Sequence, residues 1–152
     1  MPSAFPLPAA MARALDLARA AAQAQEVPIG AVVTRGGVII GEGENRNRRD
    51  NDPTAHAEIV AIRAAAARLG DFRLTDCDLY VTLEPCPMCA GAIAHARIAR
   101  LYYGAEDPKG GGVEQGACVF AHPQCHHRPE VYGGIGQAEA AALLVDFFAA
   151  RR

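Results

Sequence analysis

Residues 78–89, with the sequence DLYVTLEPCPMC, decide how this chain folds. Residues 78–83 have the short, largely apolar pattern of a β-strand. Pro85 and Pro87 then bracket Cys86, and proline is common at the first position of a helix. An alanine-rich helix is predicted from there to about Ala96, followed by a strand over residues 98–104. A strand, a helix and a second strand in succession indicate an α/β architecture.

The sequence before this unit predicts a helix and then a β-hairpin. A helix starts near Pro8, and apolar residues recur along it at helical spacing. Two β-branched runs, residues 29–34 and 38–40, flank the Arg35-Gly36-Gly37 turn and are typical of a hairpin. A polar loop is expected over residues 42–52.

A second helix is predicted to open at Asp52-Pro53-Thr54 and to end at Gly70. Its expected buried face is formed by Ala55, Ile59, Ile62, Ala66 and Leu69.

The last third of the chain predicts less regular structure. Residues 110–124 show no clear period, and residues 131–132 could form a short strand. A terminal helix is expected over residues 137–151, with an inward face of Ala140, Leu144, Phe147 and Phe148. We therefore expect one α/β domain over residues 1–152, with a mixed sheet covered by helices on both faces.

Composition excludes several classes of protein. Hydrophobic residues make up 51% of the 152 residues and charged residues 21%, as in an ordinary globular domain. Every apolar stretch of about 20 residues is interrupted by charge, so no membrane span is expected. The N-terminal segment carries Arg13, Asp16 and Arg19 and is not predicted to be a signal peptide. Five cysteines, an odd number, argue against a secreted disulfide framework, and we expect a cytoplasmic protein.

The candidate chemistry lies in two short motifs, His56-Ala57-Glu58 and Cys86-Pro87-Met88-Cys89. One imidazole and two thiolates are typical zinc ligands, and three protein ligands leave a fourth position open, as in catalytic sites. Cys86 and Cys89 lie in the first turn of a predicted helix, where the helix dipole favours thiolates. Glu58 is the natural general base beside the metal.

Two other interpretations of these motifs stay open at this point. Cys86 and Cys89 also resemble a thioredoxin-type redox pair, although that interpretation gives His56 and Glu58 no role. A closed structural zinc site could instead recruit a fourth ligand from Cys118, Cys125, His126 and His127. The combination H-x-E…P-C-x-x-C is nevertheless specific for zinc-dependent base deaminases.

The sequence resembles the bacterial tRNA-specific adenosine deaminases, which belong to the cytidine deaminase superfamily. The residues that carry this resemblance are VPIGAV at 27–32, NR at 45–46, DPTAHAE at 52–58, LYVTLEPCPMCA at 79–90 and LLVDFF at 143–148. The resemblance extends over nearly the whole chain, and residues 110–132 depart from the family pattern.

The resemblance implies a three-layer α/β/α sandwich with about five strands, and a homodimer. It implies conversion of adenosine to inosine at the wobble position of a tRNA, with release of ammonia. His56, Cys86 and Cys89 would bind Zn²⁺, and Glu58 would move protons.

The resemblance also implies contacts to the RNA. Asn45 and the backbone of Ala57 would hold the target base. Phe147 and Phe148, with the arginines that follow them, would lie near the anticodon loop. Because the net charge is −2, RNA must be held by a local patch, for which Arg46, Arg48 and Arg49 are candidates. The alternative is a free nucleobase or nucleoside deaminase of the guanine or cytosine type, which would not need these arginines.

Overall fold

A computed structural model describes residues 6–151 of the chain. It contains four α-helices, five strands and a short 3₁₀ helix, in the order α1 (Ala9–Gln23), β1 (Gly30–Arg35), β2 (Val38–Glu44), α2 (Ala57–Leu69), β3 (Cys77–Leu83), α3 (Pro87–Ala96), β4 (Arg100–Ala105), η1 (Val119–Ala121), β5 (Glu130–Tyr132) and α4 (Gln137–Ala149). The predicted hairpin, the strand–helix–strand unit and the terminal helix are all present.

The five strands form one mixed sheet in the order β2-β1-β3-β4-β5. β1 is antiparallel to both β2 and β3, whereas β3, β4 and β5 run parallel. β2 and β3 therefore point in the same direction, and their carboxyl ends lie at the same edge of the sheet. The loop to His56 leaves β2 at this edge, and Cys86 follows β3 there, so the topology brings the two motifs together.

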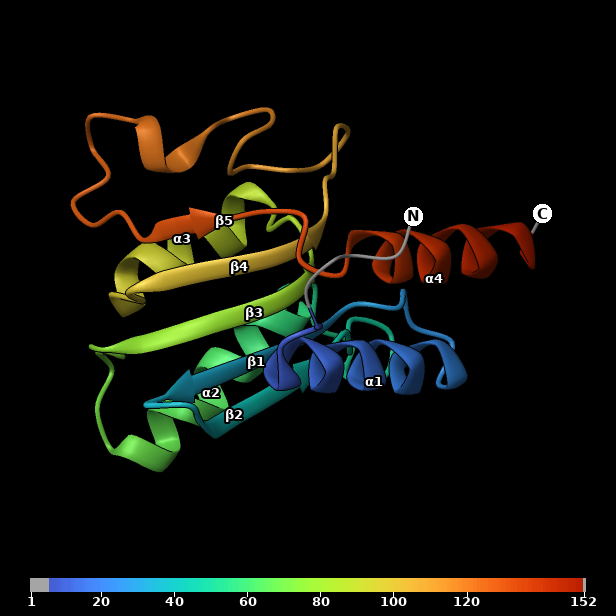
Figure 1. The fold of residues 1–152 in the computed structure, drawn as a ribbon, viewed down its shortest axis with the longest axis horizontal. Helices are drawn as coiled ribbons and strands as arrows, with labels where there is room; N and C mark the ends of the chain where they lie inside the picture. Colours follow the sequence, from blue (N-terminus) through green and yellow to red (C-terminus); the bar gives the residue numbers. More distant parts are fainter. Residues whose placement is uncertain (1–5, 152) are drawn as a thin grey trace.

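Helices cover both faces of the sheet, which confirms the predicted three-layer sandwich (Figure 1). α1 and α4 pack side by side on one face, and α2 and α3 pack on the other. The larger core lies between the sheet and the α2–α3 layer and includes Leu79, Val81, Ile93 and Leu101. No helix within residues 6–151 is both long and apolar enough to cross a membrane.

The α2 helix lies unusually close to β2, and this contact corrects the predicted buried face. Gly41 and Gly43 face the helix, and a Cβ atom at either position would lie 2.5 or 2.4 Å from a helix carbonyl oxygen. The close approach buries a stripe of alanines, Ala57, Ala61 and Ala65. The predicted Ile59–Leu69 face is only half-buried, because alanines rather than larger residues fit against the glycines. Hydrogen bonding to β1 extends β2 to Glu44, into the segment expected to be a loop.

The start of α2 also differs from the prediction. Helix α2 begins at Ala57, not at Asp52-Pro53-Thr54. The Asp52 carboxylate accepts hydrogen bonds from both the backbone N–H and the hydroxyl of Thr54, at 2.9 and 2.7 Å, and so closes a local turn. Such a turn competes with the helix for these backbone groups.

The terminal helix is two residues shorter than expected, ending at Ala149. Phe147 is buried as predicted, but Phe148 is 49% exposed, so its inward placement was wrong. Consecutive positions on a helix point about 100° apart, so the two rings cannot both face the interior. Arg152 lies outside the described residues.

Candidate metal centre and active site

His56, Cys86 and Cys89 converge at the carboxyl edge of the sheet. The Nδ1 atom of His56 lies 3.6 Å from the Cys86 sulfur and 3.5 Å from the Cys89 sulfur. Their ligand atoms all lie within 4.8 Å of one another, and within residues 6–151 this is the one group of three or more candidate ligands that does so. The two predicted motifs therefore form a single cluster.

The spacing of this cluster fits a tetrahedral metal ion. A zinc ion bound at ordinary Zn–S and Zn–N distances places the nitrogen and each sulfur about 3.6 Å apart. The observed separations of 3.5 and 3.6 Å match that value. An imidazole and two thiolates are a donor set that zinc prefers. The three side chains can therefore hold a metal ion without rearrangement of the backbone.

Two helix starts position these ligands. His56 is the N-cap residue of α2, Cys86 is the N-cap residue of α3, and Cys89 lies in the first turn of α3. Pro87 occupies the first helical position, where its missing N–H costs nothing. The pKa of Cys86 is lowered to about 4, because its sulfur accepts hydrogen bonds from the Cys89 thiol and from His56. The pKa of Cys89 is raised because it retains the proton shared with Cys86 and is buried.

Glu58 lies beside the cluster and is only 4% exposed. Burial raises the pKa of its carboxyl to about 7, with a smaller contribution from the nearby Cys86 sulfur. A carboxyl with a pKa near neutrality can both accept and release a proton at the working pH. Glu58 also lines a cavity of about 160 Å³ together with His56 and Cys86, so it faces the space in which a substrate would react.

Asn45 is 6% exposed and lies at the end of β2. Its side-chain oxygen accepts a hydrogen bond of 3.0 Å from the backbone N–H of Ala57, the first residue of α2. Asn45 thus satisfies a free N–H at the helix start, which lies at Ala57 rather than at the predicted Asp52-Pro53-Thr54. The side-chain nitrogen makes no hydrogen bond to residues 6–151 and is left available to a ligand.

Glu84 is a buried residue of the cavity that the sequence did not single out. It is 2% exposed, lines the same cavity, and immediately precedes the Pro85-Cys86 turn. Its carboxylate accepts four backbone N–H groups from a segment far along the chain, those of Asp107, Val113, Glu114 and Gln115. The position of Glu84 directly before the metal motif was a usable signal, but nothing in the sequence indicates its partners.

The arginines beside Asn45 have different surroundings. Arg46 forms a bidentate, exposed ion pair with Asp50, at 2.9 and 3.2 Å. Arg49 instead pairs with the buried Glu26 and donates to the Asn45 carbonyl oxygen at 2.6 Å. Arg48 is exposed and forms no ion pair with the described residues. Arg49 is thus part of the structure of the loop, whereas Arg46 and Arg48 are accessible to a partner.

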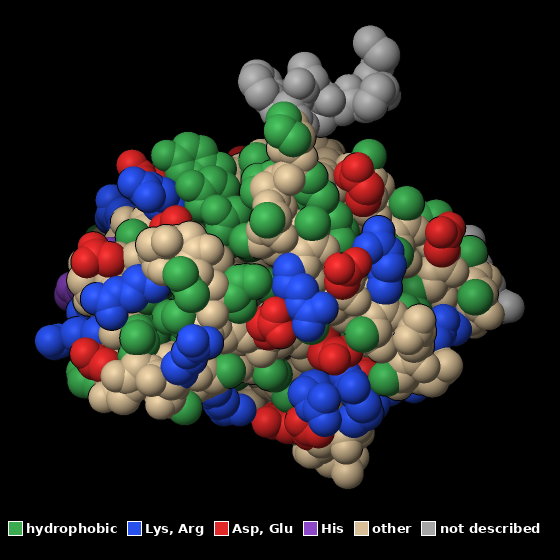
Figure 2. Space-filling model, turned by 60° about the horizontal axis from the view of Figure 1, so that its bottom comes forward, with side chains coloured by type: hydrophobic (Ala, Val, Ile, Leu, Met, Phe, Trp, Pro, Cys, Tyr) green, Lys and Arg blue, Asp and Glu red, His purple; other side chains and the backbone are tan. Residues whose placement is uncertain are grey.

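Charged side chains of both signs are mixed on the face of the molecule drawn in Figure 2. Figure 2 shows Lys and Arg side chains interspersed with Asp and Glu over one side of the molecule. Such mixed charges produce no strong field of one sign over this face.

The C-terminal aromatic residues lie on α4. The Arg151 guanidinium stacks on the buried Phe147 ring, 3.4 Å from its centroid, and donates to Gln25 at 2.7 Å. Phe148 lies against Phe147 edge to face and exposes its own ring. Of the two phenylalanines, Phe148 is therefore the one that a partner can reach.

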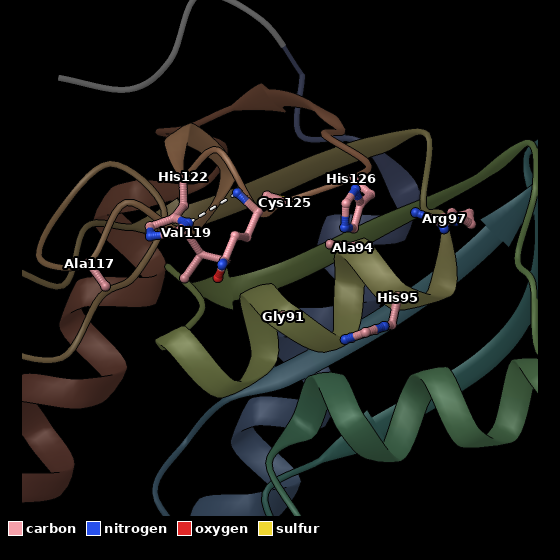
Figure 3. A pocket seen from close by; sticks show the side chains of 10 residues that line it. Gly91, Ala94, His95, Arg97, Ala117, Val119, His122, Cys125 and His126 are labelled. Carbon is pink, nitrogen blue, oxygen red and sulfur yellow. Dashed lines mark hydrogen bonds between the residues drawn. The ribbon is translucent and has the colours of Figure 1, made fainter.

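A larger cavity, of about 400 Å³, lies on the outer side of α3 and contains none of the three ligands (Figure 3). Cys125 and His126 line it, and Figure 3 shows them on the loop that passes over α3. The Cys125 thiol donates to the carbonyl oxygen of His127 at 3.1 Å. Within the described part of the chain, Cys118, Cys125, His126 and His127 all lie outside the cluster, so the closed four-ligand site is not formed.

Comparison with known proteins gives a consistent result. The sequence model of the MafB19-like deaminase family matches residues 8–152. A tRNA-specific adenosine deaminase of Agrobacterium fabrum (strain C58) is 56% identical over 142 residues, which cover 93% of this chain and 93% of that protein.

Two solved structures place the fold among purine deaminases. A structure from a study of A-to-I editing by tRNA:A34 deaminases at the wobble position of transfer RNA is 56% identical, with a TM-score of 0.88 over 89% of this chain and 98% of that chain. A guanine deaminase from Nitrosomonas europaea is 28% identical, with a TM-score of 0.77 over 98% of this chain and 88% of that chain.

Proposed function

This chain belongs to the MafB19-like deaminase family, among its tRNA-specific adenosine deaminases, and from that premise we propose that it converts the wobble adenosine of a tRNA to inosine with release of ammonia. The proposal of a tRNA substrate rests on the 56% identity to the Agrobacterium fabrum enzyme along almost the full length of both chains. The proposal of a metal-assisted deamination rests on the His56–Cys86–Cys89 cluster with Glu58 in the same cavity. We propose a cytoplasmic location, because the proposed substrate is a tRNA.

The proposed metal is Zn²⁺, held by His56 Nδ1 and the sulfurs of Cys86 and Cys89. The donor set and the 3.5–3.6 Å separations support this assignment. A zinc ion in such a site supplies a water molecule of lowered pKa and stabilises negative charge on oxygen.

Glu58 is proposed to carry the protons of the reaction. Its carboxylate first accepts a proton from the attacking water and delivers it to the purine ring nitrogen next to the reacting carbon. It then transfers the proton of the newly added hydroxyl group to the amine, which leaves as ammonia as the C–N bond breaks and the C=O bond forms. A carboxyl with a pKa of about 7 suits both directions of transfer. Because the pair of steps requires the same oxygen to accept and donate, an amide at this position cannot replace it.

Asn45 is proposed to hold the base. The Ala57 N–H fixes the side-chain oxygen of Asn45, so the side-chain nitrogen points its hydrogens in a defined direction. An anticodon loop is already unpaired, so extrusion of its base costs less than extrusion from a duplex. Arg46 and Arg48 are proposed as phosphate contacts beside this base, and Phe148 as a contact further along the loop.

A comparative activity assay tests this function. The protein is incubated separately with an arginine tRNA anticodon stem-loop, adenosine, guanine and cytidine, and ammonia and inosine are quantified, with Glu58→Gln protein as the blank. We expect ammonia and inosine from the RNA in equal amounts. Efficient turnover of guanine with none of the RNA would assign the chain to the free-base deaminases instead.

We further propose that the protein is a homodimer that associates through the outer face of α3. Three features support this face: Met88 is 39% exposed, a Cβ atom on Gly91 would meet no other atom within 4 Å, and the large apolar-walled cavity adjoins Ala94. Light scattering should report a dimer that Ala94→Arg dissociates. Val38→Arg, on an exposed β2 side chain, should leave the dimer intact, and a monomeric parent protein would contradict the proposal.

A further inference from the structure

The segment of residues 107–115 forms one wall of the reactive cavity. Asp107 and Gly110 line this cavity together with His56 and Glu58. The segment is not part of a helix or strand, so the N–H groups of its backbone need hydrogen-bond partners outside a helix or sheet. Val113 also packs into the main core.

One carboxylate holds that wall in place. One Glu84 oxygen accepts the N–H of Asp107 at 3.1 Å, and the other accepts those of Val113, Glu114 and Gln115 at 3.2, 2.9 and 3.0 Å. No arginine, lysine or histidine within residues 6–151 forms an ion pair with Glu84, so backbone dipoles alone stabilise its charge.

The packing around Glu84 is as tight as its hydrogen bonding. A Cβ atom on Gly111 would lie 2.7 Å from the Glu84 carboxylate and 2.6 Å from the carbonyl oxygen of Asp107. The N–H of Gly112 donates to the carbonyl oxygen of Pro85 at 2.8 Å. The wall is therefore attached directly to the turn that carries Cys86.

We infer that Glu84 is the positioning residue of this site, and that it holds residues 107–115 as the wall against which the nucleotide substrate is seated. The inference rests on the proposed function for the identity of the substrate, an RNA nucleotide. Glu84 itself does not touch the reacting atoms; it acts through the backbone of the wall. Its loss should therefore weaken substrate binding more than it slows the chemical step.

Glu84→Gln is the direct test. One amide oxygen can still accept the three N–H groups of residues 113–115, but the amide nitrogen then faces the N–H of Asp107, and the negative charge is lost. Hydrogen bonds to charged groups are among the stronger ones, so we expect the KM for the anticodon stem-loop to rise about tenfold or more, with kcat changed less than about threefold. Bound zinc should be unchanged.

Hydrogen exchange measures the wall without any substrate. In Glu84→Gln protein, the amides of Asp107, Val113, Glu114 and Gln115 should exchange about tenfold faster or more, while those of β3 and α3 keep their parental rates. Glu26→Gln is the matched control, because Glu26 accepts the N–H groups of Arg48 and Arg49 and should release only those amides. Glu42 lies on β2 and forms an ion pair with Arg13 of α1. Glu42→Gln should alter neither KM nor the exchange of these amides.

Two further variants keep the inference testable if Glu84→Gln protein folds poorly. Glu84→Asp keeps the charge and should restore part of the parental KM. Gly111→Ala displaces the wall sterically, without a change of charge, and should raise KM in the same way.

Unchanged exchange at Asp107 and at residues 113–115 in Glu84→Gln protein would overturn the inference. A lower melting temperature with an unchanged KM would also overturn it, because Glu84 would then act only in folding. A parent protein with no activity on RNA would refute the proposed function, while the exchange measurement would still decide the role of Glu84.

Discussion

Asn45 is expected to have two separable tasks, and substitutions at this position distinguish them. Its oxygen accepts the Ala57 N–H at 3.0 Å in a site only 6% exposed, while its nitrogen is available to the substrate. Asn45→Ala removes both groups. By analogy with the loss of an N-cap side chain, loss of this acceptor for the first N–H of α2 costs about 1–2 kcal/mol, which for a chain of this size lowers Tm by about 2–8 °C.

Asn45→Asp removes only the donor. The carboxylate still accepts the Ala57 N–H and lies at the positive end of the α2 dipole, so Tm should stay within about 2 °C of the parent value. Activity should nevertheless fall, because a carboxylate oxygen then faces an acceptor of the base. A site that loses a required hydrogen bond to its substrate is expected to lose about 100-fold or more in kcat/KM.

The assay combines thermal unfolding with kinetics on the anticodon stem-loop for the parent and both variants. Asn45→Asp protein with kcat/KM within threefold of the parent would refute the assignment of Asn45 to the base. Asn45→Ala protein with the parental Tm would refute the helix-capping argument, whatever its activity.

Four further predictions concern the proton carrier, the metal, the RNA contacts and the buried Arg49–Glu26 ion pair. Glu58→Gln should retain zinc and the parental fold but lose about 10²–10⁴-fold in kcat, and retention of most activity would move the proton transfer to another residue. Cys86→Ser should lose most of the one zinc per chain found in the parent by elemental analysis; full zinc content would contradict the ligand assignment. Arg46→Gln with Arg48→Gln should weaken RNA binding and flatten its salt dependence by roughly one unit of slope per lost phosphate contact. Arg49→Gln should instead lower Tm, since it leaves a buried carboxylate without its cation, and an unchanged Tm would show that the pair is not structural.

The metal cluster and the layer order were predictable because both depend on local patterns. His56, Cys86 and Cys89 lie at helix starts, and helix starts that follow strands of one direction meet at the same edge of a sheet. The buried face of α2 was not predictable from periodicity. Alanines and isoleucines both recur at helical spacing, and the two glycines of β2 selected the alanine face by permitting close contact.

The loop beside Asn45 shows a second limit of sequence patterns. Asp52-Pro53-Thr54 has the composition of a helix start, yet Asn45 provides the acceptor for the first N–H of α2 from 12 positions upstream. Likewise, Arg46, Arg48 and Arg49 look equivalent as a charged run, but burial of Glu26 commits Arg49 to the structure. A pattern records which groups could pair, and only the fold determines which of them do.

The wall held by Glu84 suggests how one chemical site can accept different purines. Glu84 binds the backbone N–H groups of residues 113–115, and every residue except proline offers such a group. The side chains of these residues can therefore change without loss of the wall, whereas the proposed chemistry requires His56, Glu58 and the two cysteines. Residues 110–132, where this chain departs from the family pattern, include the part of the wall that is free to vary. We therefore expect exchange of the side chains at positions 113–115, which follow the cavity-lining Gly110 in the sequence, to alter kcat/KM for RNA relative to guanine while zinc content stays constant. An unaltered ratio would assign the choice of substrate to the residues that line the cavity.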